Sequence, residues 1–184
     1  NKELLDFYTA YSTQRPDMTI TTQSWTLYEP PVDTYSQDMM DNAKEFSDVA
    51  VITLGRLAGE GHNDMPMAMA EAGYDNNSDQ YDDFQPDDHY LQLSQIEKDL
   101  VVMVCDNVDT VILLVNSGNP MELGFVDNYE QIKSVLWCPG PGNVGFTALG
   151  EILRGTVNPS GKSTDTFAYH LKNAPWWNNY EDYH

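Results

Sequence analysis

Basic residues are scarce in this sequence, with nine lysines and arginines against 29 aspartates and glutamates, for a formal net charge of −20. A field of that sign repels phosphate, so nucleic acids and anionic membranes are not expected partners, whereas neutral ligands such as sugars are compatible with it. Cysteine is also scarce. Cys105 and Cys138 have no metal-ligand spacing, so we expect free thiols, which slightly favours the cytoplasm over an oxidising compartment. No apolar run approaches the roughly 18 residues of a membrane-spanning helix.

Helical and strand patterns alternate along the chain, which predicts an α/β fold. Ser36 is a candidate N-cap, and Ser94 with Glu97 forms a capping box at the start of a second helix. Short apolar runs rich in β-branched residues predict buried strands, with 49–54 fully buried. Successive strand–helix–strand units imply a mostly parallel sheet between helices, as in a three-layer sandwich. We expect helices over 2–11, 36–46, 94–107 and 143–154, a helical turn over 129–133, and strands over 49–54, 110–116 and 134–138.

Three stretches lie outside this alternation. Residues 55–92 form a long polar segment, and six aspartates fall within 74–88. We expect an exposed acidic flap there, since the ligand pattern of a calcium-binding loop is missing. Residues 15–31 mix β-formers with prolines and predict one strand at 18–22. The tail, 174–184, has no periodicity, so we divide the chain into a domain over 1–173 and, over 174–184, an extended arm or a linker toward a following domain.

Two glycine patterns resemble phosphate-binding loops. Residues 140–145 (GPGNVG) satisfy G-x-G-x-x-G, which keeps a flavodoxin-like nucleotide-binding domain as one alternative. The pattern lies late in the chain, its prolines remove N–H donors, and the net charge is unfavourable, so we rank this alternative low. Residues 155–163 have one residue too many for a Walker A loop. An asparagine-proline-serine-glycine sequence at 158–161 predicts a turn.

Glu60 lies between Gly59 and Gly61, just beyond the strand predicted at 49–54. The carboxyl ends of parallel strands are where open α/β sheets bind ligands. The two glycines leave room for a substrate to approach. Composition alone would still make Glu60 a surface carboxylate more often than a catalytic one.

Five segments of the chain, in order, resemble motifs of family 3 glycoside hydrolases. The segment GRLAGEG is similar to the family's S-R-x-S-G-E-G loop, in which the glutamate is the general acid/base. The other four are similar to its L-P-x-x-Q helix start, its N-S-G-x-P strand end, its W-x-P-G loop and helix, and its N-P-S-G-K turn. These segments are residues 55–61, 91–100, 111–123, 135–155 and 158–167.

The resemblance implies a domain of a retaining β-glycosidase, most simply a β-glucosidase, that acts on β-linked glucosides or short oligosaccharides. Glu60 would be the general acid/base, opposite a nucleophilic aspartate on a (β/α)8 barrel domain about 5–5.5 Å away. We therefore expect this chain alone to be inactive, and expect no cofactor or metal. The family's opening strand region does not appear before Asn1, so we expect a domain truncated at its N-terminal end.

The resemblance is incomplete at the glutamate loop. The family commonly continues with E-G-x-D-R, whereas here Glu60 is followed by Gly61, His62, Asn63 and Asp64. The sequence therefore does not show which residues of this loop border the sugar-binding site.

Other polar and aromatic side chains are candidates for the sugar site. We assign Arg56 and His62 as substrate-binding candidates, with an ion pair to nearby acids as the simpler role for Arg56. His89 is a candidate to border the site, and the aromatic residues Tyr74, Tyr81 and Phe84 are candidates for stacking on a sugar. The alternative function is a non-catalytic carbohydrate-binding or structural module, in which Glu60 is a surface acid.

Overall fold

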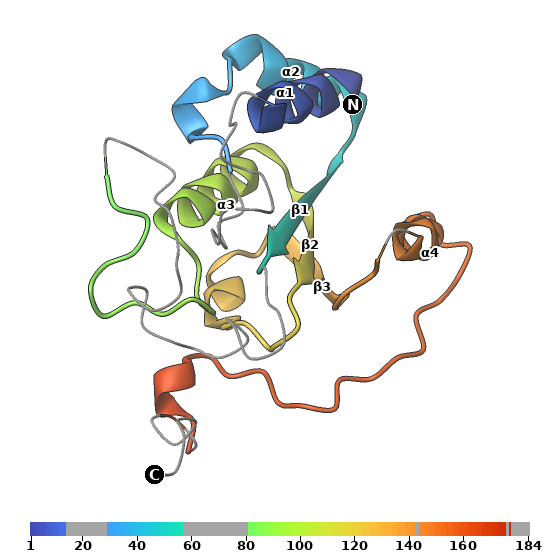
Figure 1. The fold of residues 1–184 in the computed structure, drawn as a ribbon. Helices are drawn as coiled ribbons and strands as arrows, with labels where there is room; N and C mark the ends of the chain where they lie inside the picture. The colour runs from blue at the N-terminus through green and yellow to red at the C-terminus, as the bar shows by residue number, and fades with distance from the viewer. Residues whose placement is uncertain (14–28, 57–80, 143, 176, 178–184) are drawn as a thin grey trace.

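The computed structural model describes residues 1–13, 29–56, 81–142, 144–175 and 177. The described elements are a three-stranded parallel sheet, four α-helices and three short 3-10 helices (Figure 1). The strands are β1 (Val49–Gly55), β2 (Thr110–Asn116) and β3 (Ile132–Trp137). The helices are α1 (Lys2–Thr13), α2 (Gln37–Phe46), α3 (Gln95–Asn107), α4 (Gly145–Leu153), η2 (Val32–Thr34), η3 (Gly124–Asn128) and η4 (Leu171–Asn173).

The sheet has the order β1-β2-β3, with every neighbouring pair parallel, as the strand–helix–strand pattern predicts. Val49 of β1 is paired with Thr110 of β2, and Gly55 with Asn116, so the two strands begin and end together. The β2–β3 ladder has one irregularity, between Val111 and Ile112. All three strands therefore point their carboxyl ends to the same edge of the sheet.

Helix α3 covers one face of the sheet and forms the core with it. Its buried side chains, including Leu100, Val101 and Cys105, pack against the inward side chains of β1 and β2, such as Leu54 and Leu113. The predicted capping box is confirmed: Ser94 Oγ accepts from the N–H of Glu97, and Glu97 Oε2 accepts from the N–H of Ser94. The N-cap predicted for α2 is also confirmed, because Ser36 Oγ accepts from the N–H of Met39.

The first strand is not fully buried, contrary to the sequence prediction. Ile52 and Leu54 are buried, whereas Val49 and Val51 are 41% and 46% exposed. In the part of the chain that the structure describes, β1 is an edge strand with α3 on one face only, so its side chains alternate between core and surface. An apolar run alone cannot distinguish an edge strand from a central one.

Three further predictions need correction. The helical turn expected over 129–133 is wrong, since the 3-10 helix lies earlier, at Gly124–Asn128, and β3 already begins at Ile132. The last α-helix is shorter than expected, and Gly155 follows it with φ +72°, a left-handed conformation suited to glycine. Residues 158–161 form no turn and are exposed. Helix α4 stands apart from the sheet (Figure 1).

The described part of the acidic segment is exposed in some positions and buried in others. Asp82 and residues 85–87 are exposed, as the sequence predicts, whereas Asp83 and residues 89–91 are buried, so the flap prediction does not extend to the end of the segment. The predicted strand at 18–22 and the part of the flap before residue 81 lie outside the described residues.

None of the described helices is long and apolar enough to span a membrane. Both cysteines are free, and burial raises the pKa of each thiol.

Candidate functional site

Segments from distant parts of the chain meet at the carboxyl edge of the sheet. The N–H of Arg56, just after β1, donates to the carbonyl of Asn116 at 3.0 Å. The N–H of Glu122, six residues beyond β2, donates to the carbonyl of Leu91 at 2.9 Å. Residues 81–92 therefore return to the edge from which the glutamate-bearing segment departs. Open parallel sheets bind ligands at this edge, which makes it the candidate site.

Arg56 is buried at this edge, with 8% of its surface exposed. Its Nη1 and Nη2 each lie 2.6 Å from a different carboxylate oxygen of Glu97. The remaining donors bind main-chain carbonyls: Nε binds Tyr90 at 2.6 Å, Nη1 also binds Gly55 at 2.6 Å, and Nη2 also binds Gln92. A planar guanidinium with five N–H donors suits such an arrangement, which a lysine could not reproduce.

The Arg56–Glu97 ion pair joins β1 to the start of α3. The two side chains are 5% and 13% exposed. Glu97 Oε2 accepts both from Arg56 Nη2 and from the N–H of Ser94 at 2.9 Å, so one carboxylate serves the ion pair and the capping box. The guanidinium carbon also lies 5.5 Å from the centre of the Tyr90 ring, within cation–π range.

A second buried contact at the same edge is centred on Glu122. Its Oε1 lies 2.9 Å from His89 Nε2 and accepts from the N–H of Leu171 at 2.7 Å. Oε2 lies 3.6 Å from Nδ1 of His170, which is exposed. His89 is only 2% exposed, and its ring centre is 5.1 Å from that of Trp177. Glu122 therefore links the segment before α3 to the C-terminal part of the domain.

The environment of Glu122 favours its charged form. Burial alone raises the pKa of a carboxyl, but the hydrogen bonds from His89 and from the N–H of Leu171 outweigh it here. The charges of His89 and His170 act in the same direction, and the net effect holds the pKa of Glu122 below its ordinary value. Glu122 is therefore an anionic anchor and not a proton donor near neutral pH.

The ends of β2 and β3 are joined by a tryptophan. Trp137 Nε1 donates to the carbonyl of Ser117 at 2.8 Å, and the Ser117 hydroxyl donates to the carbonyl of Asn119 at 2.7 Å. The Trp137 ring meets the edge of the Phe167 ring at 5.4 Å. These contacts fix the segment after β2, which carries the asparagine-serine-glycine motif.

The structure places only part of the predicted site. Glu60, His62 and Tyr74 lie outside the described residues. Arg56 does lie at the predicted edge, with its guanidinium bound to Glu97 and to main-chain carbonyls; contact with a substrate stays a prediction for it. His89 is buried between Glu122 and Trp177, and the two remaining aromatic candidates, Tyr81 and Phe84, are partly buried. Among the described residues, no three metal-ligating side chains form a group.

Sequence reasoning missed the partners of these buried groups. The sequence predicts a helix-capping role for Glu97 but no ion pair, and it gives no sign that Glu122 binds a histidine. No lysine or arginine lies between Arg56 and Lys98, and the sequence predicts an ion pair between Arg56 and acids of the adjacent loop. The observed partner is instead Glu97, on α3. The identity of that partner, 41 residues away, depends on the tertiary fold.

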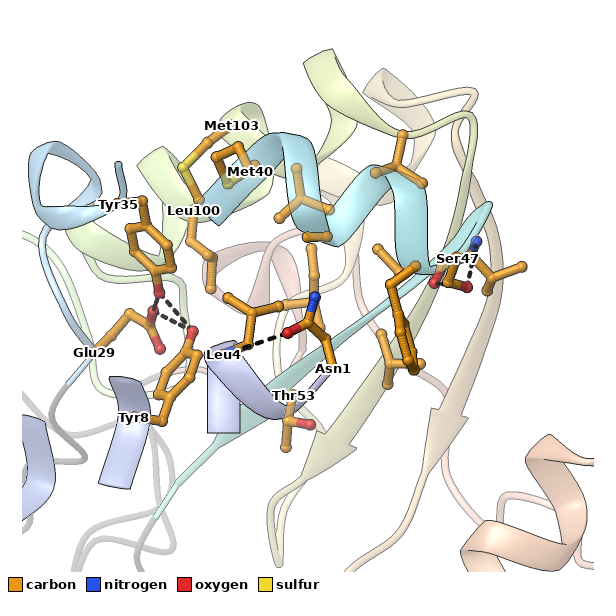
Figure 2. Close-up of a pocket in the computed structure, with 18 residues that line it drawn as sticks. Asn1, Leu4, Tyr8, Glu29, Tyr35, Met40, Ser47, Thr53, Leu100 and Met103 are labelled. Atoms are coloured by element: carbon orange, nitrogen blue, oxygen red, sulfur yellow. Dashed lines mark hydrogen bonds between the residues drawn. The ribbon is translucent and has the colours of Figure 1, made fainter. Parts of the chain in front are cut away.

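A groove of about 500 Å³ lies away from this edge, bordered by α1, α2, β1 and α3. Figure 2 shows Tyr8, Glu29 and Tyr35 pointing toward one another at one end of it. Glu29 Oε1 accepts from Tyr8 at 2.8 Å and from Tyr35 at 2.7 Å. Burial raises the pKa of Glu29 to about 7 and raises the pKa of both tyrosines.

Comparison with known proteins agrees with this α/β architecture. The model of the glycosyl hydrolase family 3 C-terminal domain matches residues 6–184. Beta-glucosidase A of Butyrivibrio fibrisolvens is 33% identical over 143 residues, which are 76% of this chain and 17% of that protein. A beta-glucosidase of Ruminococcus albus is 30% identical over 153 residues, 83% of this chain and 14% of that protein.

A solved structure has the same fold. The crystal structure of a beta-glucosidase from Paenibacillus barengoltzii superposes with a TM-score of 0.73 at 24% identity, covering 99% of this chain and 18% of that one. The chain is thus an α/β-sandwich domain with its candidate site at the carboxyl edge of a parallel sheet. It belongs to the glycosyl hydrolase family 3 C-terminal domain family. It spans less than a fifth of the length of these relatives.

Proposed function

We propose that this domain supplies the general acid/base, Glu60, to the active site of a retaining β-glycosidase. The observation that carries the proposal is the position of Glu60 in the sequence, four residues beyond Arg56, whose side chain is fixed at the carboxyl end of β1. Ligands of parallel α/β sheets bind at this edge. Two relatives named beta-glucosidases support a β-linked glucoside as the substrate.

The catalytic role of Glu60 has two steps. In the first, its carboxyl group donates a proton to the glycosidic oxygen as the bond to the sugar breaks and an aspartate forms the glycosyl-enzyme. In the second, its carboxylate takes a proton from the water that attacks the anomeric carbon and releases the aspartate. The first step requires a raised pKa, which burial against the partner domain and the charge of the nucleophile would provide.

The nucleophile belongs, in this proposal, to a (β/α)8 barrel domain of the same enzyme. The 184-residue chain alone is then expected to hydrolyse no aryl β-glucoside, because one carboxylate of the pair is missing. Turnover by the purified chain, above that of its Glu60→Gln variant, would contradict the division of the site between two domains.

The test of Glu60 is the kinetics of the full-length enzyme with Glu60→Gln on β-glucosides with phenyl and dinitrophenyl leaving groups. The variant loses the proton donor, which a poor leaving group needs and a good one does not. We expect kcat/KM for the phenyl glucoside to fall by about 100-fold or more, while the dinitrophenyl glucoside keeps most of its rate of bond cleavage. Azide should then speed turnover and yield a β-glucosyl azide, because it needs no general base.

A matched control is Glu151→Gln, which makes the same change on the exposed surface of α4. It should behave like the wild type with both substrates. If Glu60→Gln also keeps wild-type rates on both, the glutamate loop is not catalytic. The domain would then act as a structural or carbohydrate-binding module.

A further inference from the structure

The groove between α1, α2, β1 and α3 has the size and the lining of a small-molecule site. Its volume of about 500 Å³ falls within the range of roughly 300–1,000 Å³ that such sites occupy. The side chains along it are mostly apolar, among them Leu4, Met40, Phe46, Val51 and Met103. Phe46 and Val51 are 68% and 46% exposed, so apolar surface is available to a ligand. Methionine side chains adapt readily to the shape of what they bind.

One end of the groove is polar and is built around Glu29. Its Oε1 accepts from the hydroxyls of Tyr8 and Tyr35 at 2.8 Å and 2.7 Å, and these two hydroxyls lie 2.6 Å apart. Its Oε2 forms no hydrogen bond or ion pair with any residue in the described ranges. Figure 2 shows the three side chains gathered at this end. Two phenols therefore hold the carboxyl group in place and leave one of its oxygens for a ligand.

The charges around Glu29 favour a cationic partner. Burial raises its pKa to about 7, against the lowering effect of the hydrogen bonds from Tyr35 and Tyr8, and the negative charge of Glu97 raises it further. A buried carboxylate is costly unless a positive charge or a hydrogen-bond donor compensates it. The chain as a whole carries a net charge of −20, which attracts cations and repels anions. A ligand that suits both ends of the groove therefore has a positive head and an apolar body.

We propose that the groove binds a small organic cation, a primary ammonium with an apolar tail. The ammonium group forms an ion pair with Oε2 of Glu29, and the tail lies along the apolar side chains. The rings of Tyr8 and Tyr35, whose centres are 6.3 Å apart, flank the carboxyl group, and such rings also attract ammonium groups. The inference makes no use of Glu60 and does not rest on the proposed glycosidase function.

The test is calorimetric titration of the full-length enzyme with n-octylammonium, 1-octanol and octanoate, which share one tail and differ in charge. At about pH 8 we expect octylammonium to bind at least about tenfold more tightly than octanol, and octanoate to bind most weakly. At about pH 5.5 Glu29 is protonated, whereas the amine keeps its charge, so the preference should disappear. Of the other groups that act on Glu29, Tyr8 and Tyr35 have raised pKa values and stay neutral, and Glu97 is paired with Arg56.

Three variants locate the site. Glu29→Gln keeps an oxygen acceptor without the charge, so octylammonium should fall to the affinity of octanol, and octanol binding should not change. Glu45→Gln makes the same change on the exposed surface of α2 and should bind like the wild type. Ala43→Phe adds bulk to the groove and should weaken both ligands.

Three results would overturn the inference. One is equal affinity for octylammonium and octanol in the wild type. Another is a tenfold preference that survives in Glu29→Gln, since the cation would then bind elsewhere. The third is no binding of either ligand at millimolar concentration, which would mean that another part of the enzyme covers the groove.

Discussion

Glu122 and His89 form a buried pair at the carboxyl edge of the sheet, with Oε1 and Nε2 2.9 Å apart. The two residues are 33 positions apart in the sequence. The same carboxylate oxygen accepts from the N–H of Leu171, so the pair also holds η4 against the edge. One carboxylate thus contributes to holding η4, in the C-terminal part of the domain, against the edge of the sheet.

Substitution Glu122→Gln should release that C-terminal part. Hydrogen bonds to a charged acceptor are worth more than neutral ones, and we expect a loss of about 1 kcal/mol, or roughly fivefold in protection. The measurement is hydrogen exchange of peptides covering Leu171–Asn173 in the full-length protein, corrected for intrinsic exchange rates.

The pH dependence of that protection tests the same charge. The pKa of Glu122 is lowered in the folded state, so its stabilising effect is complete above the ordinary carboxyl pKa. The effect is lost as the pH falls through the folded value. Wild-type protection should therefore decline at acidic pH, while the Glu122→Gln variant should be low and flat. A variant with the wild-type profile would show that the carboxylate does not hold η4.

Glu29 should give the hydrogen-exchange protection of α1 the opposite pH dependence, with protection falling as the pH rises. Burial raises its pKa to about 7, the hydrogen bonds from Tyr35 and Tyr8 lower it, and the charge of Glu97 raises it further. A raised carboxyl pKa means that the charged form is penalised, so stability falls as the pH rises from the ordinary value to about 7. Protection of α1 from hydrogen exchange should decrease over that range.

Two variants test whether the Glu29 carboxyl causes the pH-dependent loss of protection in α1. Glu29→Gln keeps an oxygen acceptor for Tyr8 and Tyr35 without the charge, so protection of α1 should become independent of pH. Tyr8→Phe removes a hydrogen bond that favours the carboxylate, so the loss of protection should move to higher pH. An unchanged profile in Glu29→Gln would rule out this carboxyl as the titrating group.

Gly124 should not tolerate alanine, for a reason unrelated to backbone angles. A Cβ at this position would lie 2.6 Å from the carbonyl oxygen of Tyr169 and 3.1 Å from its carbonyl carbon. Because the obstacle is main chain, the 169 region must move, and we expect a loss of about 1–3 kcal/mol. Gly161→Ala is the matched control, since nothing lies within 4 Å of its Cβ. Equal hydrogen-exchange protection of residues 166–173 in both variants would contradict the predicted clash.

Local sequence patterns predicted the elements whose determinants lie within a few residues. The caps at Ser36 and Ser94 and the capping box with Glu97 were identified because each side chain binds a main-chain group three residues away. Strand β2 was predicted with its observed limits from one apolar, β-branched run. The parallel order followed from the alternation of strands and helices.

The resemblance identified the family correctly, and the family model confirms it over nearly the whole chain. The role of Glu60, the substrate contacts of Arg56 and His62, and the division of the chain at residue 174 stay predictions.

The sequence by itself determined the α/β class, the main helices and strands, and the family, because these depend on local capping, periodicity and short motifs. Only the tertiary structure decided that β1 alternates between core and surface, since this depends on its neighbours in the sheet. It also decided that Arg56 binds Glu97 and that His89 binds Glu122. These partners lie 41 and 33 residues apart, and they meet because α3 and the segment before it pack against the carboxyl edge of the parallel sheet.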